Sequence, residues 1–272
     1  MKCMNEPYWE SPYLKGKDLR LELAGALEVA QLKFFDARDN RMNYQGLAVS
    51  EEYKHLFRVV RSLPTFSLMK VEGRVEQLAF WLNIYNTLVI NIIVEERMED
   101  GPMTLEGFYN SHRYNIDGKY FSLDDIEHGI LRANTPKYMS LSGVFSRTDP
   151  RLDYVLKQAD PRVHFAFACG ACSCPPLRAY FADRVDRQLD EAVTGALDRW
   201  VELDRGQIKL DVPKLFHWYK KDFGEDGDIV KFIIKHLQDP DSRNYLAANA
   251  QRIDISFLDF NWDLNSMNGV TT

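Results

Sequence analysis

Apolar residues recur at helical spacing in the first third of the chain. Residues 18–35 and 50–62 place apolar side chains three and four positions apart, the pattern of helices with one face in a core. Ser50 gives the second helix only a partial cap, because Tyr53 stands where a capping box has an acidic or amide residue. Residues 74–98 are apolar on almost every side, so we expect this helix at the centre of the core.

A hairpin and a short helix are predicted next. In RYNIDGKYFSL, Tyr114, Ile116 and Tyr120 alternate around the turn signal Asp117-Gly118. Ser122 then stands three residues before an acidic residue, in capping-box order, and starts a helix that ends at residue 132. Residues 133–152 contain two prolines and a glycine and are predicted to form a loop.

The second half alternates helices with short strands. Residues 163–169 are predicted to form a buried strand and residues 181–201 an amphipathic helix. Further strands are expected at 207–212 and 255–265, and helices at 214–224 and 228–238. We therefore predict an α+β fold, a mostly helical single domain over residues 18–265 with a small mixed or antiparallel sheet. Residues 1–17 and 266–272 are expected to be loose tails.

Composition narrows the classes of function. The 272 residues are 45% hydrophobic and 12% aromatic, which is typical of a folded domain large enough to bury a core. A net charge of −6 argues against nucleic-acid binding and against electrostatic attachment to anionic lipid. The N-terminus has no apolar secretory segment, and the longest apolar window, about 15 residues, is too short for a bilayer span. We expect a cytoplasmic protein without a membrane span, and no cofactor.

Three of the four cysteines lie in the stretch RVHFAFACGACSCPPLRAY. They do not form a disulfide framework in the pattern of small secreted domains, and a structural zinc normally has four ligands in two separated pairs, so we expect no metal site. A redox pair of Cys169 and Cys172 remains an alternative, as does a packing role for all three thiols. As a nucleophile, Cys174 or Cys169 would need a nearby base, and Gly170 would permit close approach of the backbone.

A candidate base lies in SLDDIEHGILR. In a helix Asp124, His128 and Arg132 share one face, and Asp124 could hold the imidazole in one tautomer, as the acid of a catalytic triad does. Glu127 lies next to His128 and beside Asp124. The same residues would also serve as a surface network of ion pairs, so this alternative stays open.

Other polar residues fall in apolar surroundings. Asn83 and Asn86 lie on one face of the central helix, and buried amides must be hydrogen-bonded, either lining a site or fixing loop backbone. Arg162 and His164 would point to one side of the predicted strand.

Taken together, these segments resemble the domain of unknown function 547 family. The matching pieces are AFWLNIYNTLVI, YFSLDDIEHGILR, DPRVHFAFACGACSCPPLRAY, KLFHWYKKDFG and FLDFNWDLN, in this order over residues 40–265. The residues that correspond to the family pattern are Asn83, Asn86, Glu127, His128, Arg162, His164, Cys169, Gly170, Ser173, Cys174 and Pro175. This chain departs from the pattern at Ala168, where the family has asparagine, at Cys172, where a basic residue is common, and at Phe260-Asn261, where Tyr-Asp is expected. The resemblance implies signalling or protein-interaction contexts, because family members occur alone or joined to other modules.

Two functions are consistent with these features. The first is a cysteine-dependent hydrolase or acyltransferase, papain-like or transglutaminase-like, with Cys174 or Cys169 as nucleophile, His128 as base and Asp124 as its orienting acid. In that function the groups that bind substrate or the oxyanion would be Gly170, Ser173, Arg162, His164, Asn83, Asn86 and Glu127. The second is a non-catalytic interaction or signalling domain, in which a buried Asn/His/Cys network fixes loops and a protein or peptide partner binds at the surface.

Overall fold

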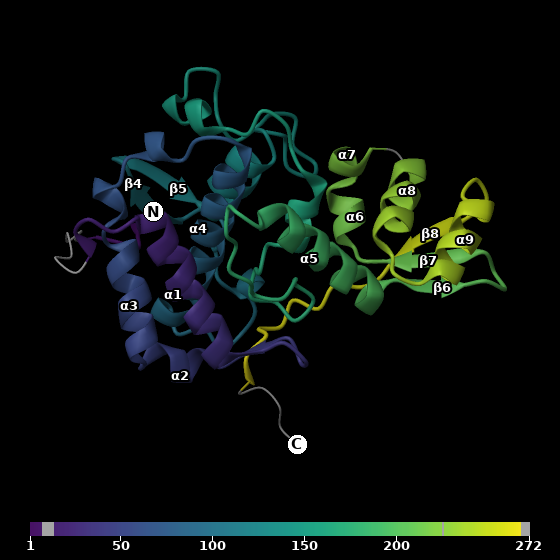
Figure 1. Ribbon diagram of the computed structural model, residues 1–272, viewed down its shortest axis with the longest axis horizontal. Helices are drawn as coiled ribbons and strands as arrows, with labels where there is room; N and C mark the ends of the chain where they lie inside the picture. The colour runs from purple at the N-terminus through teal and green to yellow at the C-terminus, as the bar shows by residue number, and fades with distance from the viewer. Residues whose placement is uncertain (7–13, 225, 268–272) are drawn as a thin grey trace.

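A computed structural model describes residues 1–6, 14–224 and 226–267. The chain is one α+β domain, as predicted from the sequence. Helices α1 to α5 and a small sheet form its larger part, and α6 to α9 with a second sheet form the smaller part (Figure 1). Two apolar clusters form the core, one in each part.

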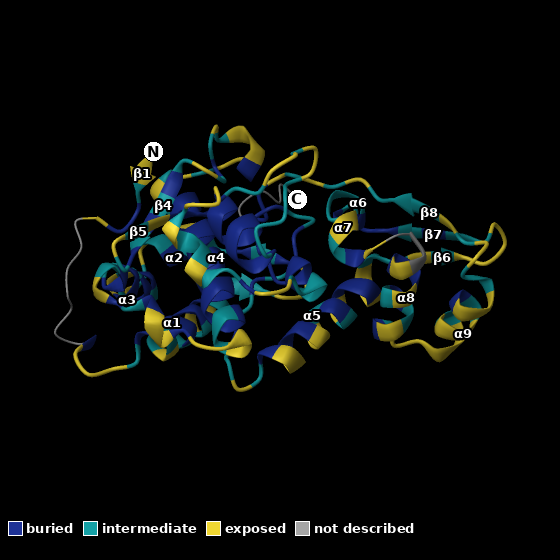
Figure 2. Cartoon of the chain, turned by 90° about the horizontal axis from the view of Figure 1, so that it is seen from above, coloured by how far each residue is buried: buried dark blue, intermediate teal, exposed yellow. Residues whose placement is uncertain are grey.

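The central helix α4 (Arg74–Glu95) organises the larger part. Its residues from Leu78 to Ile93 are all buried, which confirms the prediction of a core helix (Figure 2). By length and composition α4 could cross a membrane, but 89% of its apolar window is buried inside the protein, as in the core helix of a soluble domain.

The polar residues of α4 fix loop backbone. The Asn83 amide donates to the carbonyl of Tyr180 at 2.7 Å and accepts from its N–H at 2.8 Å. The Asn86 amide donates to the carbonyls of Ala166 and Arg178, each at 3.2 Å, and accepts from the N–H of Ala168 at 3.0 Å. Of the two roles left open for these asparagines, the contacts are those of loop-fixing residues.

Short elements surround α4. Asp18 caps α1 (Leu19–Phe34), which packs against α4 and against α3 (Glu51–Val60). The side chain of Ser50 accepts from the N–H of Tyr53, so the partial cap is formed. The remaining short elements of this part are β2 (Phe35–Asp36), β3 (Arg41–Met42), α2 (Tyr44–Ala48) and the 3₁₀ turns Leu63–Thr65, Leu68–Lys70, Pro102–Thr104 and Pro150–Tyr154.

The predicted hairpin forms from β4 (His112–Ile116) and β5 (Lys119–Ser122), which pair antiparallel around a turn with positive φ at Asp117 and Gly118. A third strand, β1 (Lys2–Cys3), pairs parallel with β4, and Asn5 donates to the carbonyls of Val60 and Asn115. The prediction of a loose tail over residues 1–17 is therefore wrong for residues 2–5, and residues 7–13 lie outside the described residues. Of the predicted tail at 266–272, residues 268–272 also lie outside.

The helix predicted after Ser122 is a π-helix (Asp125–Leu131) and not an α-helix. Its capping box is present, since the Asp125 carboxylate accepts from both the N–H and the hydroxyl of Ser122. Its wider turns show in the bond from Arg132 N–H to the carbonyl of Glu127, five residues back, at 2.9 Å. A Cβ on Gly129 would come within 2.4 Å of the Phe145 ring, so this position needs glycine.

The strand predicted over residues 163–169 does not form. A 3₁₀ helix (Pro161–Phe165) replaces its first half, started by Pro161 and by the Asp160 side chain, which accepts from the N–H of Arg162. The second half is irregular. The side chain of Asn86 bonds to the backbone of Ala166 and Ala168 in place of a neighbouring strand.

Helix α5 (Val185–Trp200) joins the two parts, because Val185 and Leu189 pack in the first apolar cluster and Val193 and Leu197 in the second. In the smaller part, strand β7 pairs antiparallel with β6 and parallel with β8. The elements are β6 (Glu202–Asp204), β7 (Lys209–Val212), α6 (Leu215–Trp218), α7 (Lys220–Phe223), α8 (Asp226–His236), α9 (Pro240–Asn249) and β8 (Asp254–Phe257).

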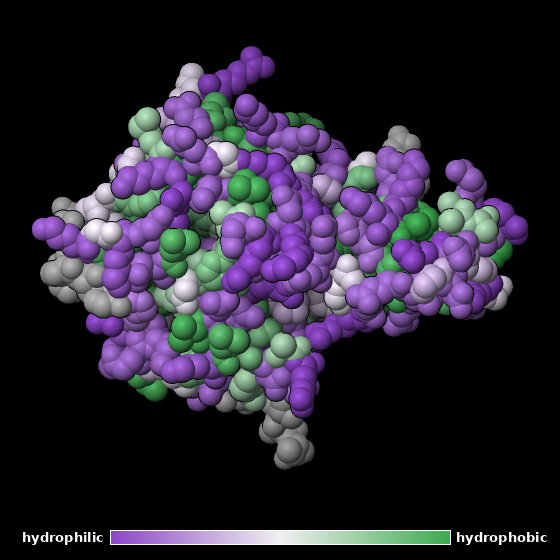
Figure 3. All heavy atoms as spheres, in the orientation of Figure 1, coloured by the Kyte–Doolittle hydropathy of each residue, from purple (hydrophilic) through white to green (hydrophobic). Residues whose placement is uncertain are grey.

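The final strand is shorter than predicted, because only Asp254–Phe257 pairs with β7. Residues 258–267 then run back to the larger part (Figure 1), where Leu264 bridges to Ala171 and Ser266 to Met42. This return segment therefore places residues 260–262 beside the cysteine-containing turn. On the face shown in Figure 3 hydrophilic residues predominate and apolar residues lie in small groups.

We expect Asn86→Ala to lower the free energy of unfolding by about 2–4 kcal/mol, since three backbone groups, two of them buried, lose their partner. Urea denaturation of this variant and of Asn110→Ala, at an exposed position, tests this prediction. Equal stability of the two variants would contradict a structural role for the buried amide.

Candidate active site

A cavity of about 410 Å³ lies where α4, the π-helix, the cysteine-containing turn, α6 and the return segment meet. Its walls contain all four predicted catalytic residues and many aromatic rings. The residues that line it are Tyr85, Met103, Tyr109, Asp124, Glu127, His128, Lys137, Tyr138, His164, Phe167, Cys169, Cys174, Pro175, Leu215, Trp218, Tyr219, Phe260 and Trp262.

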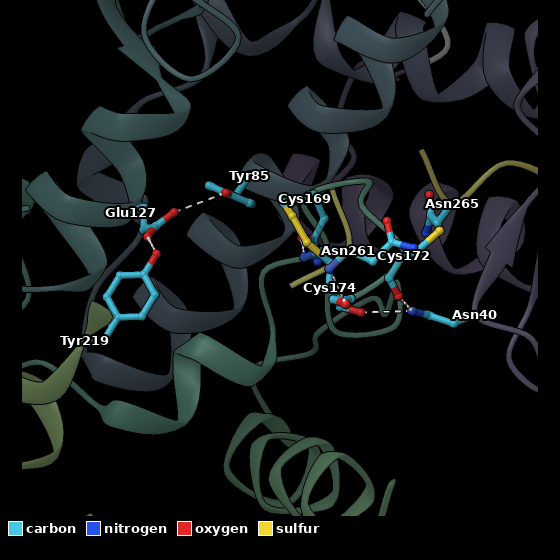
Figure 4. The surroundings of a disulfide bond; sticks show 12 residues. Asn40, Tyr85, Glu127, Cys169, Cys172, Cys174, Tyr219, Asn261 and Asn265 are labelled. Atoms are coloured by element: carbon cyan, nitrogen blue, oxygen red, sulfur yellow. Dashed lines mark hydrogen bonds between the residues drawn. A yellow bond between two sulfur atoms is a disulfide. The ribbon is translucent and has the colours of Figure 1, made fainter. Parts of the chain in front are cut away.

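Glu127 lies deep in this cavity with its side chain 6% exposed. Its carboxylate accepts hydrogen bonds from the hydroxyl of Tyr219 at 2.6 Å and from that of Tyr85 at 3.1 Å (Figure 4). Burial by itself would raise the pKa of Glu127, but the N–H of the His128 ring, the hydrogen bond from the Tyr219 hydroxyl and the guanidinium of Arg132 behind the wall outweigh it and leave the pKa below its ordinary value. The carboxylate is therefore ionised at neutral pH.

His128 is held as a neutral imidazole. The guanidinium of Arg132 donates to Nδ1 at 2.6 Å, so the ring proton must reside on Nε2. Nε2 lies 3.6 Å from a carboxylate oxygen of Glu127 and 3.7 Å from one of Asp124. Burial lowers the pKa of His128 to about 4, more than the Glu127 carboxylate raises it. Because neither nitrogen is a free acceptor, His128 is poorly suited to the role of general base.

Asp124 has the opposite character. Its carboxylate forms an ion pair with Lys137, which comes from the loop after the π-helix. Burial raises the pKa of Asp124 to about 6, although Lys137 acts in the other direction. A carboxylate with a pKa near neutrality at a cavity wall can both accept and donate a proton. Asp124 is therefore better suited to proton transfer than His128.

A buried ion pair lies behind these groups. Arg132 and Asp222 have side chains 1% and 2% exposed and are joined by two hydrogen bonds of 2.5 and 2.9 Å. His164 Nε2 donates to the same carboxylate at 2.7 Å, and its ring stacks on Tyr219 at 3.9 Å between centroids. Burial would raise the pKa of Asp222, but the bonds from His164 and Arg132 lower it to about 2.

Cys169 and Cys174 form a disulfide, with their Cα atoms 5.9 Å apart. The sequence predicts no framework of several disulfides and offers Cys169 and Cys172 as the alternative redox pair. The structure instead pairs Cys169 with Cys174, because the turn brings these two residues together. Cys172 is a free thiol outside the cavity lining. In the disulfide state neither Cys169 nor Cys174 can act as a nucleophile.

The backbone of this turn is largely occupied. The N–H of Ser173 donates to the carbonyl of Asn261, and that of Cys172 to the carbonyl of Asp263. Gly170 has φ +86°, and a Cβ there would lie 2.6 Å from the Ile93 side chain. The turn is thus fastened to the return segment, and the Ser173 N–H has no free direction in which to hold an oxyanion.

The other candidate residues lie elsewhere. Asn83, Asn86, Gly170, Ser173 and Arg162 are not part of the cavity lining. The guanidinium of Arg162 forms ion pairs with Asp160, Asp186 and Asp190. The structure therefore brings together Asp124, Glu127, His128, His164, Cys169 and Cys174 and leaves these five residues apart.

Sequence analysis does not identify four residues that contact the candidate groups in the folded chain, namely Tyr85, Lys137, Tyr219 and Asp222. The sequence does contain a signal for Tyr85, because an aromatic hydroxyl in an apolar helix needs a buried partner. Tyr219 and Asp222 lie in WYKKD, where three-residue spacing places both on one side of a helical turn. No local signal connects them with Glu127 and Arg132, about 90 residues earlier.

Comparison with known proteins identifies one family. Residues 69–195 match the family described as "Protein of unknown function, DUF547". No curated protein and no solved structure matches the chain. The matched segment is narrower than the predicted span of 40–265, but it contains α4, the hairpin, the π-helix and the cysteine-containing turn. The walls supplied by α6, by Tyr219 and by the return segment lie outside it.

We expect Asp222→Asn to lower the free energy of unfolding at pH 7 by about 3–5 kcal/mol, because Arg132 keeps its buried charge without a counter-charge. The pKa of Asp222 in the folded chain, about 2, lies below its ordinary value of 3.8. The contribution of Asp222 to the free energy of unfolding is therefore complete above its ordinary pKa and is lost as the pH falls through about 2.

Denaturant titrations at pH 7, 5 and 3 measure the difference between wild type and variant, which should be largest at pH 7 and 5 and smaller at pH 3. Asp198→Asn, at an exposed position of α5, is the matched control. A difference that does not change with pH would contradict the assignment of Asp222 as an ionised partner.

Proposed function

We propose that this chain, whose residues 69–195 belong to the DUF547 family, is a cysteine-dependent hydrolase or acyltransferase that acts when Cys169 and Cys174 are reduced. One observation carries the proposal: both cysteines line the same aromatic-walled cavity as Asp124 and Glu127. In the view of Figure 4, Tyr85 lies between Glu127 and the disulfide.

The disulfide is the inactive state in this proposal. A dithiol reductant would transfer two electrons to the Cys169–Cys174 bond, which leaves two thiols on the chain and a disulfide in the reductant. A reducing cytoplasm, the proposed location of this chain, would keep the pair open.

Asp124 and His128 exchange the roles that the sequence predicted for them. Asp124 would take the proton of the attacking thiol, because its carboxylate is ionised above about pH 6 and lies at the cavity wall. His128 would position the carboxylates, since Nδ1 is occupied by Arg132 and the Nε2 proton faces Glu127 and Asp124. Glu127 stays ionised between two tyrosine hydroxyls and favours positive charge in the cavity.

The reaction would follow the usual course of thiol acyl transfer. The thiolate attacks the carbonyl carbon of an ester, thioester or amide, a C–S bond forms, and the bond to the leaving group breaks as that group receives the proton held by Asp124. Water or another nucleophile then gives a proton to Asp124 and attacks the acyl carbon, the C–S bond breaks, and the cysteine sulfur takes that proton back. The cavity volume is sufficient for an acyl group that carries a short carbon chain.

The buried polar network favours the alternative, a non-catalytic interaction domain. Asn83, Asn86 and His164 bond only to backbone or to buried side chains, as expected of groups that fix loops. In this alternative a protein or peptide partner binds at the surface, and the disulfide is structural. Loss of the disulfide would then lower the melting temperature without exposing a reactive thiol.

We expect reduction to create a reactive thiol at Cys169 or Cys174. After treatment with a dithiol, iodoacetamide should alkylate one of them at pH 7 at least about tenfold faster than Cys172, which lies outside the cavity that contains the proposed base Asp124. The rate should rise as the pH increases through about 6, where Asp124 ionises, and then level off. Peptide mass spectrometry of timed samples measures all three cysteines in one experiment.

Asp124→Asn should abolish this rise, while Asp198→Asn should leave it unchanged. The reduced wild type should also release nitrophenol from 4-nitrophenyl acetate in a burst of about one equivalent per chain, which Cys169→Ser or Cys174→Ser removes. Alkylation of both cysteines at the rate of Cys172 would contradict the enzyme proposal and favour the alternative.

A further inference from the structure

The wall of the cavity carries more negative than positive charge. Asp124 and Glu127 are carboxylates, whereas Lys137 supplies the only cation among the described residues that line the cavity, since His128 is neutral. Arg132 does not change this balance, because its charge is matched by Asp222 behind the wall. A buried carboxylate without a full counter-charge is stabilised by a cation that enters the cavity.

The deep wall also consists of hydrogen-bond acceptors. The Tyr85 and Tyr219 hydroxyls each donate a hydrogen bond to Glu127, so toward the cavity their oxygens can only accept hydrogen bonds. His164 donates from Nε2 to Asp222, and its buried Nδ1 has no partner among the described residues. A ligand group that fits this wall must therefore donate hydrogen bonds.

The outer wall is aromatic. The ring of Trp218 lies 5.1 Å from Phe260 and 5.6 Å from Trp262, and the rings of Phe260 and Trp262 lie 4.4 Å apart. Aromatic faces attract cations and also cover the methylene groups of an alkyl chain. Carboxylates at the base and indole rings at the side together suit an alkylammonium group.

Lys137 already makes such a contact. It extends from the loop after the π-helix, lines the cavity and places its ammonium group on the carboxylate of Asp124, with 36% of its side chain exposed. The place beside Asp124 thus holds an alkylammonium group in the structure.

We propose that the cavity binds a primary alkylammonium ligand, such as the lysine side chain of a peptide, and that Lys137 occupies its place in the free protein. Binding of the ammonium group goes beyond the proposed thiol chemistry and does not require it. If the bound amine also attacks the acyl-enzyme and so accepts its acyl group, that further role rests on the proposed function.

Calorimetric titration of the disulfide-intact protein at pH 7.5 with pentylamine, pentanol and pentanoate tests this proposal. We expect pentylamine to bind at least about tenfold more tightly than pentanol, and pentanoate not to bind. Lys137→Ala should tighten pentylamine binding by about tenfold because it vacates the place beside Asp124, whereas Lys54→Ala, at an exposed position of α3, should have no effect.

Asp124→Asn should weaken pentylamine binding by at least about tenfold, and its circular dichroism and melting temperature establish that the variant is folded. The proposal is overturned if pentanol binds as tightly as pentylamine, if pentanoate binds more tightly, or if Lys137→Ala leaves the affinity unchanged. Because the disulfide is intact in every titration, these outcomes are independent of the alkylation results that test the thiol chemistry.

Discussion

The buried ion pair between Arg132 and Asp222 is the constraint on which the rest of the site depends. It joins the end of the π-helix to α7, and so connects the larger and the smaller part of the domain. Arg132 fixes the tautomer of His128, and Asp222 fixes that of His164. With α7 held in this way, Tyr219 reaches Glu127, and α6 brings Trp218 to the cavity wall. Two charges removed from water are costly unless each is fully paired, so the parts cannot move apart without a large loss of stability.

The same network separates the behaviour of three acidic residues. Asp222 accepts hydrogen bonds from the guanidinium of Arg132 and the ring of His164 and has a pKa of about 2. Asp124 is buried beside a single lysine and has a pKa of about 6. Glu127 stays ionised through tyrosine hydroxyls and the groups around it. Pairs of carboxylates whose surroundings push their pKa values apart are typical of sites that transfer protons. Charge in this cavity is therefore set by burial and partners, and not by residue type.

The return segment gives the cysteine-containing turn its shape. Backbone hydrogen bonds from Cys172 and Ser173 to residues 263 and 261 hold the middle of the turn against the return segment. The two ends of the turn, Cys169 and Cys174, lie close together and form the disulfide. The same segment supplies Phe260 and Trp262 to the cavity. The disulfide and the aromatic wall thus have a common origin in one extended stretch that crosses from the smaller part to the larger.

Local sequence was sufficient for the features that depend on neighbouring residues. The apolar run of α4, the Asp117-Gly118 hairpin and the capping box at Ser122 are all determined within a few positions of themselves. For the same reason the α+β class, and the resemblance to the family that residues 69–195 match, could be recognised in advance. Candidate residues such as Asp124, Glu127 and His128 were found because they are close together along the chain.

Only the tertiary structure decided what depends on partners far along the chain. Residues 163–169 are apolar enough for a strand, but Asn86 supplies their hydrogen bonds, so no strand forms. His128 was predicted to be a base, but its Nδ1 is taken by Arg132, which Asp222 orients from 90 residues away. Cys169 pairs with Cys174 because the return segment bends the turn. The spacing of apolar residues indicates which face of an element is buried. The tautomer of a histidine, the pKa of a carboxylate and the pairing of cysteines depend instead on which groups come into contact in the folded chain, and packing over the whole domain determines those contacts.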